Sequence, residues 1–166
     1  MIRDSVSGRA WKFGDNVSTD SIAPGRLISL RANPPEYAKH LLEDVNPEFA
    51  KNVAVDDFIV AGVNFGCGSS REIAPMIIKI SGVGAVLAKS FGRIFYRNAV
   101  NNGMLLIECD TDKINDGEVI TADILGRRIT AERGLKIPFN LSESEIKIIN
   151  EGGLLNYIEK YNSLDI

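Results

Sequence analysis

The sequence has few residues that bind metal ions. Its 166 residues include two cysteines, Cys67 and Cys109, and one histidine, His40. A closed zinc site takes four ligands, so these three residues fill one only if a carboxylate joins them. A four-iron cluster needs at least three thiolates and usually four. We therefore predict that this chain holds no metal or cofactor of its own, and that any metal in its function comes from another protein.

The chain also lacks a basic excess, long apolar runs and a signal sequence. Its 19 Lys and Arg against 22 Asp and Glu give a net charge of -3, which argues against nucleic acid as the main partner. No stretch approaches the roughly 18 apolar residues of a membrane span, so no membrane association is expected. The N-terminal segment has no apolar core of the signal-peptide kind, which predicts a cytoplasmic location. Disulfides are rare in that compartment, so both thiols are expected to stay reduced.

The length and composition fit one globular domain. With 45% apolar and 25% charged residues, the chain has the balance of a globular protein, and 166 residues suffice for one hydrophobic core. The sequence has no internal repeat and no low-complexity tract. We therefore expect a single domain over residues 1–166.

The middle of the chain alternates apolar runs with amphipathic segments. Unbroken apolar runs predict buried strands at residues 58–61, 85–88 and 104–107. Between them, residues 73–80 and 93–100 are expected to be helical. A strand-helix-strand-helix-strand order favours parallel pairing with right-handed crossovers.

The flanking segments follow other patterns. Residues 9–13 alternate as a strand does, and residues 14–35 resemble one long irregular loop, of the length that is usually functional. Around Leu125-Gly126 two strand-like runs predict a C-terminal β-hairpin. Further helices are expected near Tyr37–Leu42, near 47–51, at 143–150 and at 154–161. The fold class predicted is α/β: a mostly parallel central sheet with flanking helices and a C-terminal β-hairpin.

A glycine-rich segment, NFGCGSSRE at residues 64–72, lies between a buried strand and a helix. Ligands of open α/β sheets bind at the carboxyl ends of strands, and glycines let backbone N–H groups approach an anion there. The Arg71 guanidinium adds a fork that can grip a carboxylate. The alternative is plain helix capping, because Ser69 and Glu72 have the spacing of a capping box.

Pro75 bears on that choice. If Ser69 were the N-cap, the proline ring would lie past the first helical turn and clash with a carbonyl. A helix that begins after Arg71 avoids the clash and leaves the hydroxyls of Ser69 and Ser70 free. This argument favours an anion site without excluding capping.

The same segment resembles the hallmark of the swivelling small domain of the aconitase superfamily. The resemblance is greatest to the separate small subunits of the 3-isopropylmalate dehydratase and homoaconitase type, and it spans residues 8–160. Three further segments agree in order: GRAWKFGDN with STDSIAP at 8–24, FAK at 49–51, and AKSFGRIFYRN at 88–98.

The resemblance implies a hydro-lyase that moves a hydroxyl to the neighbouring carbon through an unsaturated acid. In that family a [4Fe-4S] cluster on a large subunit binds the substrate, and the small subunit caps the site. It therefore implies a large-subunit partner with the cluster, and a small hydroxy-carboxylate substrate. The isolated chain is expected to be prone to self-association.

The resemblance also implies roles for particular residues. Ser69 would abstract the proton, and Ser70 and Arg71 would bind a substrate carboxylate with the backbone at Gly68. Thr19 and Asp20 match a pair that lines the site, in which the aspartate orients a proton-relay histidine of the partner. The alternative for that pair is an Asx-type turn that only orders the loop.

In these subunits residues 14–35 include a flexible loop that recognises the side group of the substrate. An arginine at the discriminating position matches a distal carboxylate, and apolar residues match an isopropyl group. Ser29 falls at that position here, and the stretch is largely apolar: it comprises Leu27, Ile28, Ser29, Leu30 and Arg31. This favours 3-isopropylmalate, hence leucine biosynthesis, or a related alkylmalate such as dimethylmalate. Homoaconitate is the alternative if Arg26 or Arg31 reaches a carboxylate.

The remaining polar residues receive plainer interpretations. Arg93 and Arg97 have an alternative as ordinary surface charges of a helix, Cys67 is expected to be a small buried filler, and His40 is expected to be solvated. A different class of function also stays open, namely a non-catalytic module that binds an organic anion. That module would bind a carboxylate without any iron–sulfur partner.

Overall fold

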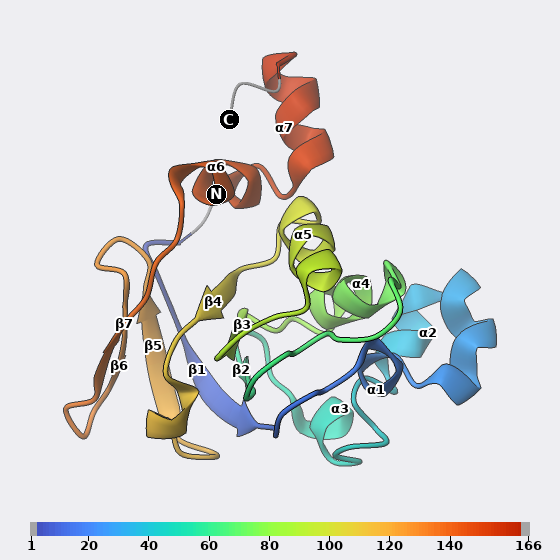
Figure 1. Ribbon diagram of the computed structural model, residues 1–166, viewed down its shortest axis with the longest axis horizontal. Helices are drawn as coiled ribbons and strands as arrows, with labels where there is room; N and C mark the ends of the chain where they lie inside the picture. The colour runs from blue at the N-terminus through green and yellow to red at the C-terminus, as the bar shows by residue number, and fades with distance from the viewer. Residues whose placement is uncertain (1–2, 164–166) are drawn as a thin grey trace.

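A computed structural model describes residues 3–163, and one curled mixed sheet forms its centre (Figure 1). Within these residues the sheet has seven strands in the order β4-β3-β2-β1-β5-β6-β7. The strands are β1 (Ser5–Lys12), β2 (Phe58–Val60), β3 (Ala85–Ala88), β4 (Leu106–Glu108), β5 (Val119–Asp123), β6 (Arg128–Ala131) and β7 (Lys136–Pro138).

Strand β1 joins a parallel half of the sheet to an antiparallel half. It pairs parallel with β2, and the parallel order continues to β3 and β4. On its other side it pairs antiparallel with β5, followed by β6 and β7. The α/β class is confirmed. The expected C-terminal hairpin, β5 and β6, gains β7 as a third strand and attaches to the parallel strands through β1.

The helices lie mainly along the parallel half (Figure 1). Helices α4 and α5 lie beside the parallel strands, whereas α6 and α7 lie at the far end of the molecule. The helical elements are α1 (Thr19–Ile22), the 3-10 helix η1 (Gly25–Ala32), α2 (Pro34–Ala38), α3 (Phe49–Asn52), α4 (Ile73–Ile80), α5 (Arg93–Asn101), the 3-10 helix η2 (Thr111–Lys113), α6 (Glu143–Asn150) and α7 (Leu154–Tyr161).

Apolar side chains of the central strands are buried on both faces of the sheet. Along β2, Ile59 belongs to a core cluster with residues of α4, whereas Phe58 and Val60 belong to a second cluster. The second cluster also contains Ile120 of β5 and Ile129 of β6, so the antiparallel strands fold back over this face. Burial on both faces explains why these strands have unbroken apolar runs.

Strand β1 begins at Ser5 rather than at the expected position 9. Its first half pairs with β5, for instance Val6 with Ala122, a partner that local alternation does not reveal. Gly8 lies in this half against the chain at Asp56, where a Cβ would stand 2.1 Å from the carbonyl oxygen. Glycine is therefore needed at a position where it weakens the strand signal.

Residues 14–35 are not one irregular loop. Ser18 caps α1 by accepting a hydrogen bond from the Ser21 backbone N–H, and residues 25–32 form η1. Leu27 and Leu30 pack against the core, and this tertiary packing orders a segment whose local sequence is that of a loop. The helix expected up to Leu42 ends at Ala38, although Leu42 stays buried.

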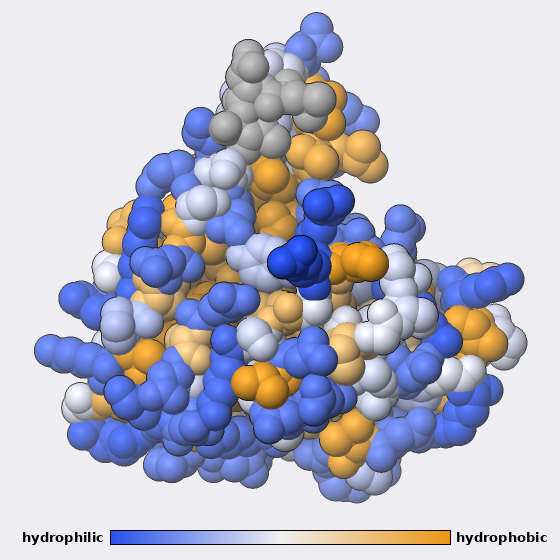
Figure 2. Space-filling model, viewed as in Figure 1, coloured by the Kyte–Doolittle hydropathy of each residue, from blue (hydrophilic) through white to orange (hydrophobic). Residues whose placement is uncertain are grey.

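The surface is mostly hydrophilic. On the face drawn in Figure 2, apolar residues appear as separate small patches among hydrophilic ones. Among the described residues, the most exposed large apolar side chains belong to Leu155, Leu125 and Val55. They belong to three separate segments of the chain: α7, the β5–β6 turn and the chain before β2. Self-association of the isolated chain stays a prediction.

Asp57 is a buried carboxylate that joins β1 to the chain before β2, and its loss should destabilise the fold. It accepts hydrogen bonds from the Trp11 indole N–H at 2.9 Å, the Ala54 backbone N–H at 2.9 Å and the Arg9 backbone N–H at 3.0 Å. Asp57→Ala leaves these donors unsatisfied, so we expect the free energy of unfolding to fall by about 3 kcal/mol in urea denaturation. As a control, Asp116→Ala removes one exposed bond to Lys12 and should cost under about 1 kcal/mol. Equal losses in the two variants would contradict this role of Asp57.

Candidate functional site

Three loops meet where β1, β2 and β3 end. The loop after β2 pairs with the loop after β1, because the Gly66 N–H donates to the Val17 carbonyl at 2.7 Å and the Thr19 N–H donates to the Cys67 carbonyl at 2.9 Å. It also pairs with the loop after β3 through an isolated bridge between Phe65 and Phe91. The glycine-rich segment is therefore held between its two neighbours at the carboxyl edge of the parallel strands.

Two glycines in these loops are required by close contacts. Gly66 has a φ of +79°, and a Cβ there would lie 2.2 Å from Cγ of Phe95 in α5. At Gly92, which precedes α5, a Cβ would lie 2.8 Å from the Gly66 carbonyl oxygen. Any side chain at either position would push the loop away from the start of α5.

Ser69 and Ser70 follow Gly68 at the surface of the molecule. Both residues are exposed, and neither hydroxyl makes a hydrogen bond within the described residues. Helix α4 begins at Ile73 with Glu72 as its N-cap, and no side chain caps it. The capping alternative for Ser69 is therefore excluded, as the position of Pro75 indicated.

Within the described residues, only one of the two terminal nitrogens of Arg71 has a partner. Its Nη2 lies 2.5 Å from Oδ1 of Asp20, whereas its Nη1 is buried and has no hydrogen-bond acceptor in the described structure. A buried donor without a partner is costly, so this nitrogen calls for an acceptor that the described chain does not supply. Gly25 lies beside the pair, since a Cβ there would stand 3.7 Å from Nη1.

Thr19 and Asp20 have different positions. The Thr19 side chain is 2% exposed, and its hydroxyl donates to the Ser69 carbonyl at 2.8 Å. Thr19 thus fixes the backbone that carries the serine. Asp20 is exposed and contacts Arg71 rather than the cavity itself, so its pairing with a partner histidine stays a prediction.

A cavity of about 340 Å³ connects these groups. It brings together the predicted residues Thr19, Gly68, Ser69, Ser70 and Arg71. The start of α5, from Gly92 to Phe95, and Asn98 also line it. A small cavity with a guanidinium and free hydroxyls in a partly apolar wall suits an organic anion.

The predicted specificity residues lie outside this cavity. Among residues 27–31, none lines it, and Leu27 and Leu30 pack against the core. Ile28, Ser29 and Arg31 are exposed instead. Arg26 forms ion pairs with Glu43 and Asp44, so in this chain it is already engaged with acidic partners.

Comparisons with known proteins agree with this geometry. The Aconitase C-terminal domain family matches residues 34–112. The chain is 52% identical to 3-isopropylmalate dehydratase small subunit 2 of Archaeoglobus fulgidus, over 96% of this chain and 98% of that protein. It is 49% identical to small subunit 1 of Thermotoga maritima, over 95% of this chain and 97% of that protein.

The chain belongs to the 3-isopropylmalate dehydratase small-subunit family. A crystal structure of 3-isopropylmalate dehydratase from Methanocaldococcus jannaschii superposes with a TM-score of 0.91 at 44% identity, covering 95% of both chains. The fold assigned to this family from the four motifs is therefore confirmed.

At three places the structure differs from what the sequence alone led us to expect. Arg93 and Asn98 of α5 line the cavity, although Arg93 had the alternative of a surface charge. Cys67 is half-buried in the cavity wall, not a buried filler. His40 is partly buried, and its Nδ1 lies 2.5 Å from Glu43. The available signal for Arg93 was its position at the start of the helix that follows β3, at the carboxyl edge of the sheet.

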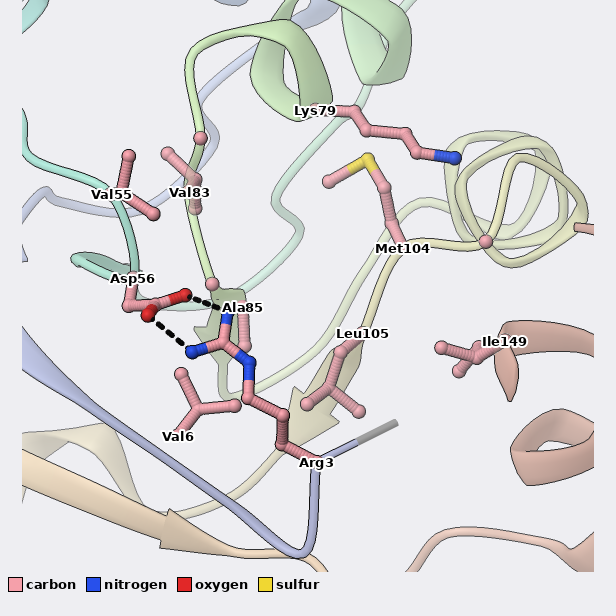
Figure 3. A pocket seen from close by; sticks show the side chains of 13 residues that line it. Arg3, Val6, Val55, Asp56, Lys79, Val83, Ala85, Met104, Leu105 and Ile149 are labelled. Atoms are coloured by element: carbon pink, nitrogen blue, oxygen red, sulfur yellow. Dashed lines mark hydrogen bonds and ion pairs between the residues drawn. The ribbon is translucent and has the colours of Figure 1, made fainter. Parts of the chain in front are cut away.

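The small-subunit fold also has a cavity at the other edge of the sheet (Figure 3). It measures about 360 Å³ and contains none of the predicted site residues. Val6 and Leu105 line it, and Arg3 points to Asp56 with an Nη1–Oδ2 distance of 2.6 Å. In residues 3–163 no cluster of three or more His, Cys, Asp or Glu could hold a metal ion. That part of the chain also has no helix of the length and apolarity that a membrane span needs.

The two thiols should react at different rates. Burial raises the pKa of Cys109 to about 12, so its thiolate fraction at pH 8 is roughly one in ten thousand. Cys67 lies in the wall of the open cavity. We expect a maleimide to label the Cys109→Ser variant, which keeps Cys67, at least about tenfold faster than the Cys67→Ser variant. Equal labelling rates in the folded chain would show that the cavity is closed in solution.

Proposed function

We propose that this chain is the small subunit of a hydro-lyase that isomerises 3-isopropylmalate by dehydration and rehydration, as in leucine biosynthesis. One observation carries the proposal. Ser69, whose hydroxyl has no partner in the described chain, and Arg71, whose Nη1 has no acceptor there, line one cavity in a chain about half identical to named small subunits. We also expect it to work in the cytoplasm.

Arg71 would bind and orient one substrate carboxylate. Asp20 engages one side of the guanidinium and leaves Nη1 for the ligand. The Asp20 carboxylate thereby fixes the plane of the guanidinium before the substrate arrives. A preoriented donor loses less entropy on binding than a free arginine does.

Ser69 would move the proton. Its Oγ, as an oxyanion, would take the proton next to a carboxylate during dehydration and return one to the neighbouring carbon during rehydration. A neutral serine hydroxyl is a poor base, and its oxyanion forms only where positive charge or N–H groups stabilise it; the Arg71 charge together with the glycine-rich backbone can supply that stabilisation. Thr19 contributes by fixing the Ser69 carbonyl.

The chain would be active only with a large subunit. Its serines are exposed, whereas the reaction needs a site from which water is excluded. The two thiols of the chain cannot hold a [4Fe-4S] cluster, so we assign the cluster to the large subunit. When bound there, the cluster supplies a Lewis acid for the substrate hydroxyl. Asp20 keeps Oδ2 free of hydrogen bonds within the described chain, and this oxygen is the one we assign to the relay histidine of the partner.

Ser69→Ala in the reconstituted two-subunit enzyme should lower kcat by about 10²- to 10⁴-fold, because the proton acceptor is lost. KM should change little, since Arg71 still binds the carboxylate. The measurement is steady-state conversion of 3-isopropylmalate at saturating large subunit, with melting temperature as a check on folding. Ser5→Ala, an exposed serine at the start of β1, is the matched control.

Full activity of Ser69→Ala would remove Ser69 as the base while leaving the subunit assignment intact. If instead the isolated chain binds carboxylates tightly and no large subunit associates with it, the enzyme proposal fails. The function would then be a non-catalytic organic-anion module.

The segment of η1 should set substrate preference through its exposed residues. We expect wild-type enzyme to show a higher kcat/KM for 3-isopropylmalate than for dimethylmalate, citrate or homocitrate. Ser29→Arg adds a charge that matches a distal carboxylate, so the ratio of kcat/KM for homocitrate over 3-isopropylmalate should rise about tenfold. Ala32→Arg places the same charge at the end of η1 and should leave the ratio unchanged. The same rise in both variants would mean that the effect is non-specific.

A further inference from the structure

Arg93 is a second guanidinium in the wall of the site cavity. It is the first residue of α5, it is exposed, and it makes no ion pair within the described residues. It lines the same cavity as Ser69 and Arg71 but belongs to a different element of the fold. Its position in the wall makes it available to a ligand that reaches Arg71.

Most other arginines of the chain are already engaged. Arg9 lies over the Trp11 ring, with 4.3 Å between its Cζ and the ring centroid. Only Arg31, Arg93 and Arg97 of the described chain lack both an ion pair and a ring contact, and of these three only Arg93 lines the site cavity. The arginines with carboxylate partners are Arg3, Arg26, Arg71, Arg127, Arg128 and Arg133.

The charge balance of the cavity depends on Arg93. The Arg71 charge is partly offset by Asp20 at 2.5 Å, so Arg71 presents less than a full positive charge to a bound ligand. Arg93 adds a full positive charge that no carboxylate of the described chain offsets within 4.0 Å. A substrate with two carboxylates carries two negative charges, and a single half-neutralised guanidinium matches only one of them.

The backbone at Arg93 is fixed relative to the glycine-rich loop. The Gly92 N–H donates to the Phe65 carbonyl at 2.9 Å, directly before Arg93. The Phe95 ring packs edge-on against Phe65, with centroids 5.4 Å apart, and it closes over Gly66. The start of α5 therefore cannot move away from the loop that carries Ser69 without breaking these contacts.

We propose that Arg93 binds the second carboxylate of the substrate, while Arg71 binds the first. Arg93 is thus a specificity-determining residue that selects dicarboxylates over monocarboxylates. The uncapped first turn of α5, with Gly92 as its N-cap, adds partial positive charge on the same side. The inference rests on the proposed function and names the group that reads the second charge of the substrate.

The test uses the enzyme assembled with its large subunit. Arg93→Gln should raise KM for 3-isopropylmalate roughly 10- to 100-fold, because a charge-assisted bond is lost, with kcat within about twofold. Arg93→Lys, which keeps the charge, should recover part of the loss. Arg97→Gln is the matched control: Arg97 is one turn further along α5 and lines a neighbouring cavity but not this one, so KM should stay unchanged.

Competitive inhibition separates a dicarboxylate effect from a general one. Malate should inhibit the Arg93→Gln enzyme at least about tenfold more weakly than the wild type, whereas inhibition by lactate, which has one carboxylate, should not change. Equal weakening of both inhibitors would overturn the inference.

The association of the subunits is measured in parallel by titrating the large subunit. If Arg93→Gln weakens association but KM is unchanged at saturating large subunit, Arg93 contacts the partner and the inference is wrong. If neither KM nor association changes in Arg93→Gln, the inference about Arg93 is also wrong. The proposed function still holds in that case, provided that the wild-type complex is active. A wild-type complex without activity on any hydroxy-dicarboxylate would overturn both.

Discussion

The site depends on the packing of the glycine-rich loop between two neighbouring loops. Backbone hydrogen bonds join Gly66 to Val17 and Cys67 to Thr19, and the face of Gly66 closes on Phe95 of α5. Because the backbone is held on both sides, the side chains that follow are turned outward at the carboxyl edge of the sheet. The exposure of Ser69 is thus a result of backbone packing, and the helix cap plays no part in it.

Local sequence determined much of the fold. Apolar runs located β2 and β3, and the end of the glycine-rich segment located α4, since Pro75 allows only a start after Arg71. What local sequence could not show came from distant segments. The first half of β1 forms because β5 pairs with it, and η1 is ordered because Leu27 and Leu30 reach the core.

The candidate site could be predicted only in part, because the sequence shows residues that are neighbours in the chain but not contacts between distant segments. One contiguous motif supplied Ser69, Ser70 and Arg71, and the structure places all three at one cavity. The contact between Asp20 and Arg71 joins two separate motifs, and nothing in either motif specifies that they pair. Arg93 has the sequence of a solvated helical residue, and only the arrangement of the strands brings it to the same cavity as Ser69.

The pairing of Asp20 with Arg71 has a consequence for assembly. The guanidinium is held in place by a residue of its own chain, so its orientation does not wait for the large subunit. When the two proteins meet, little side-chain freedom remains to be lost at this point of contact. Under the proposed function, the free subunit therefore already presents an oriented guanidinium to a carboxylate before the large subunit binds.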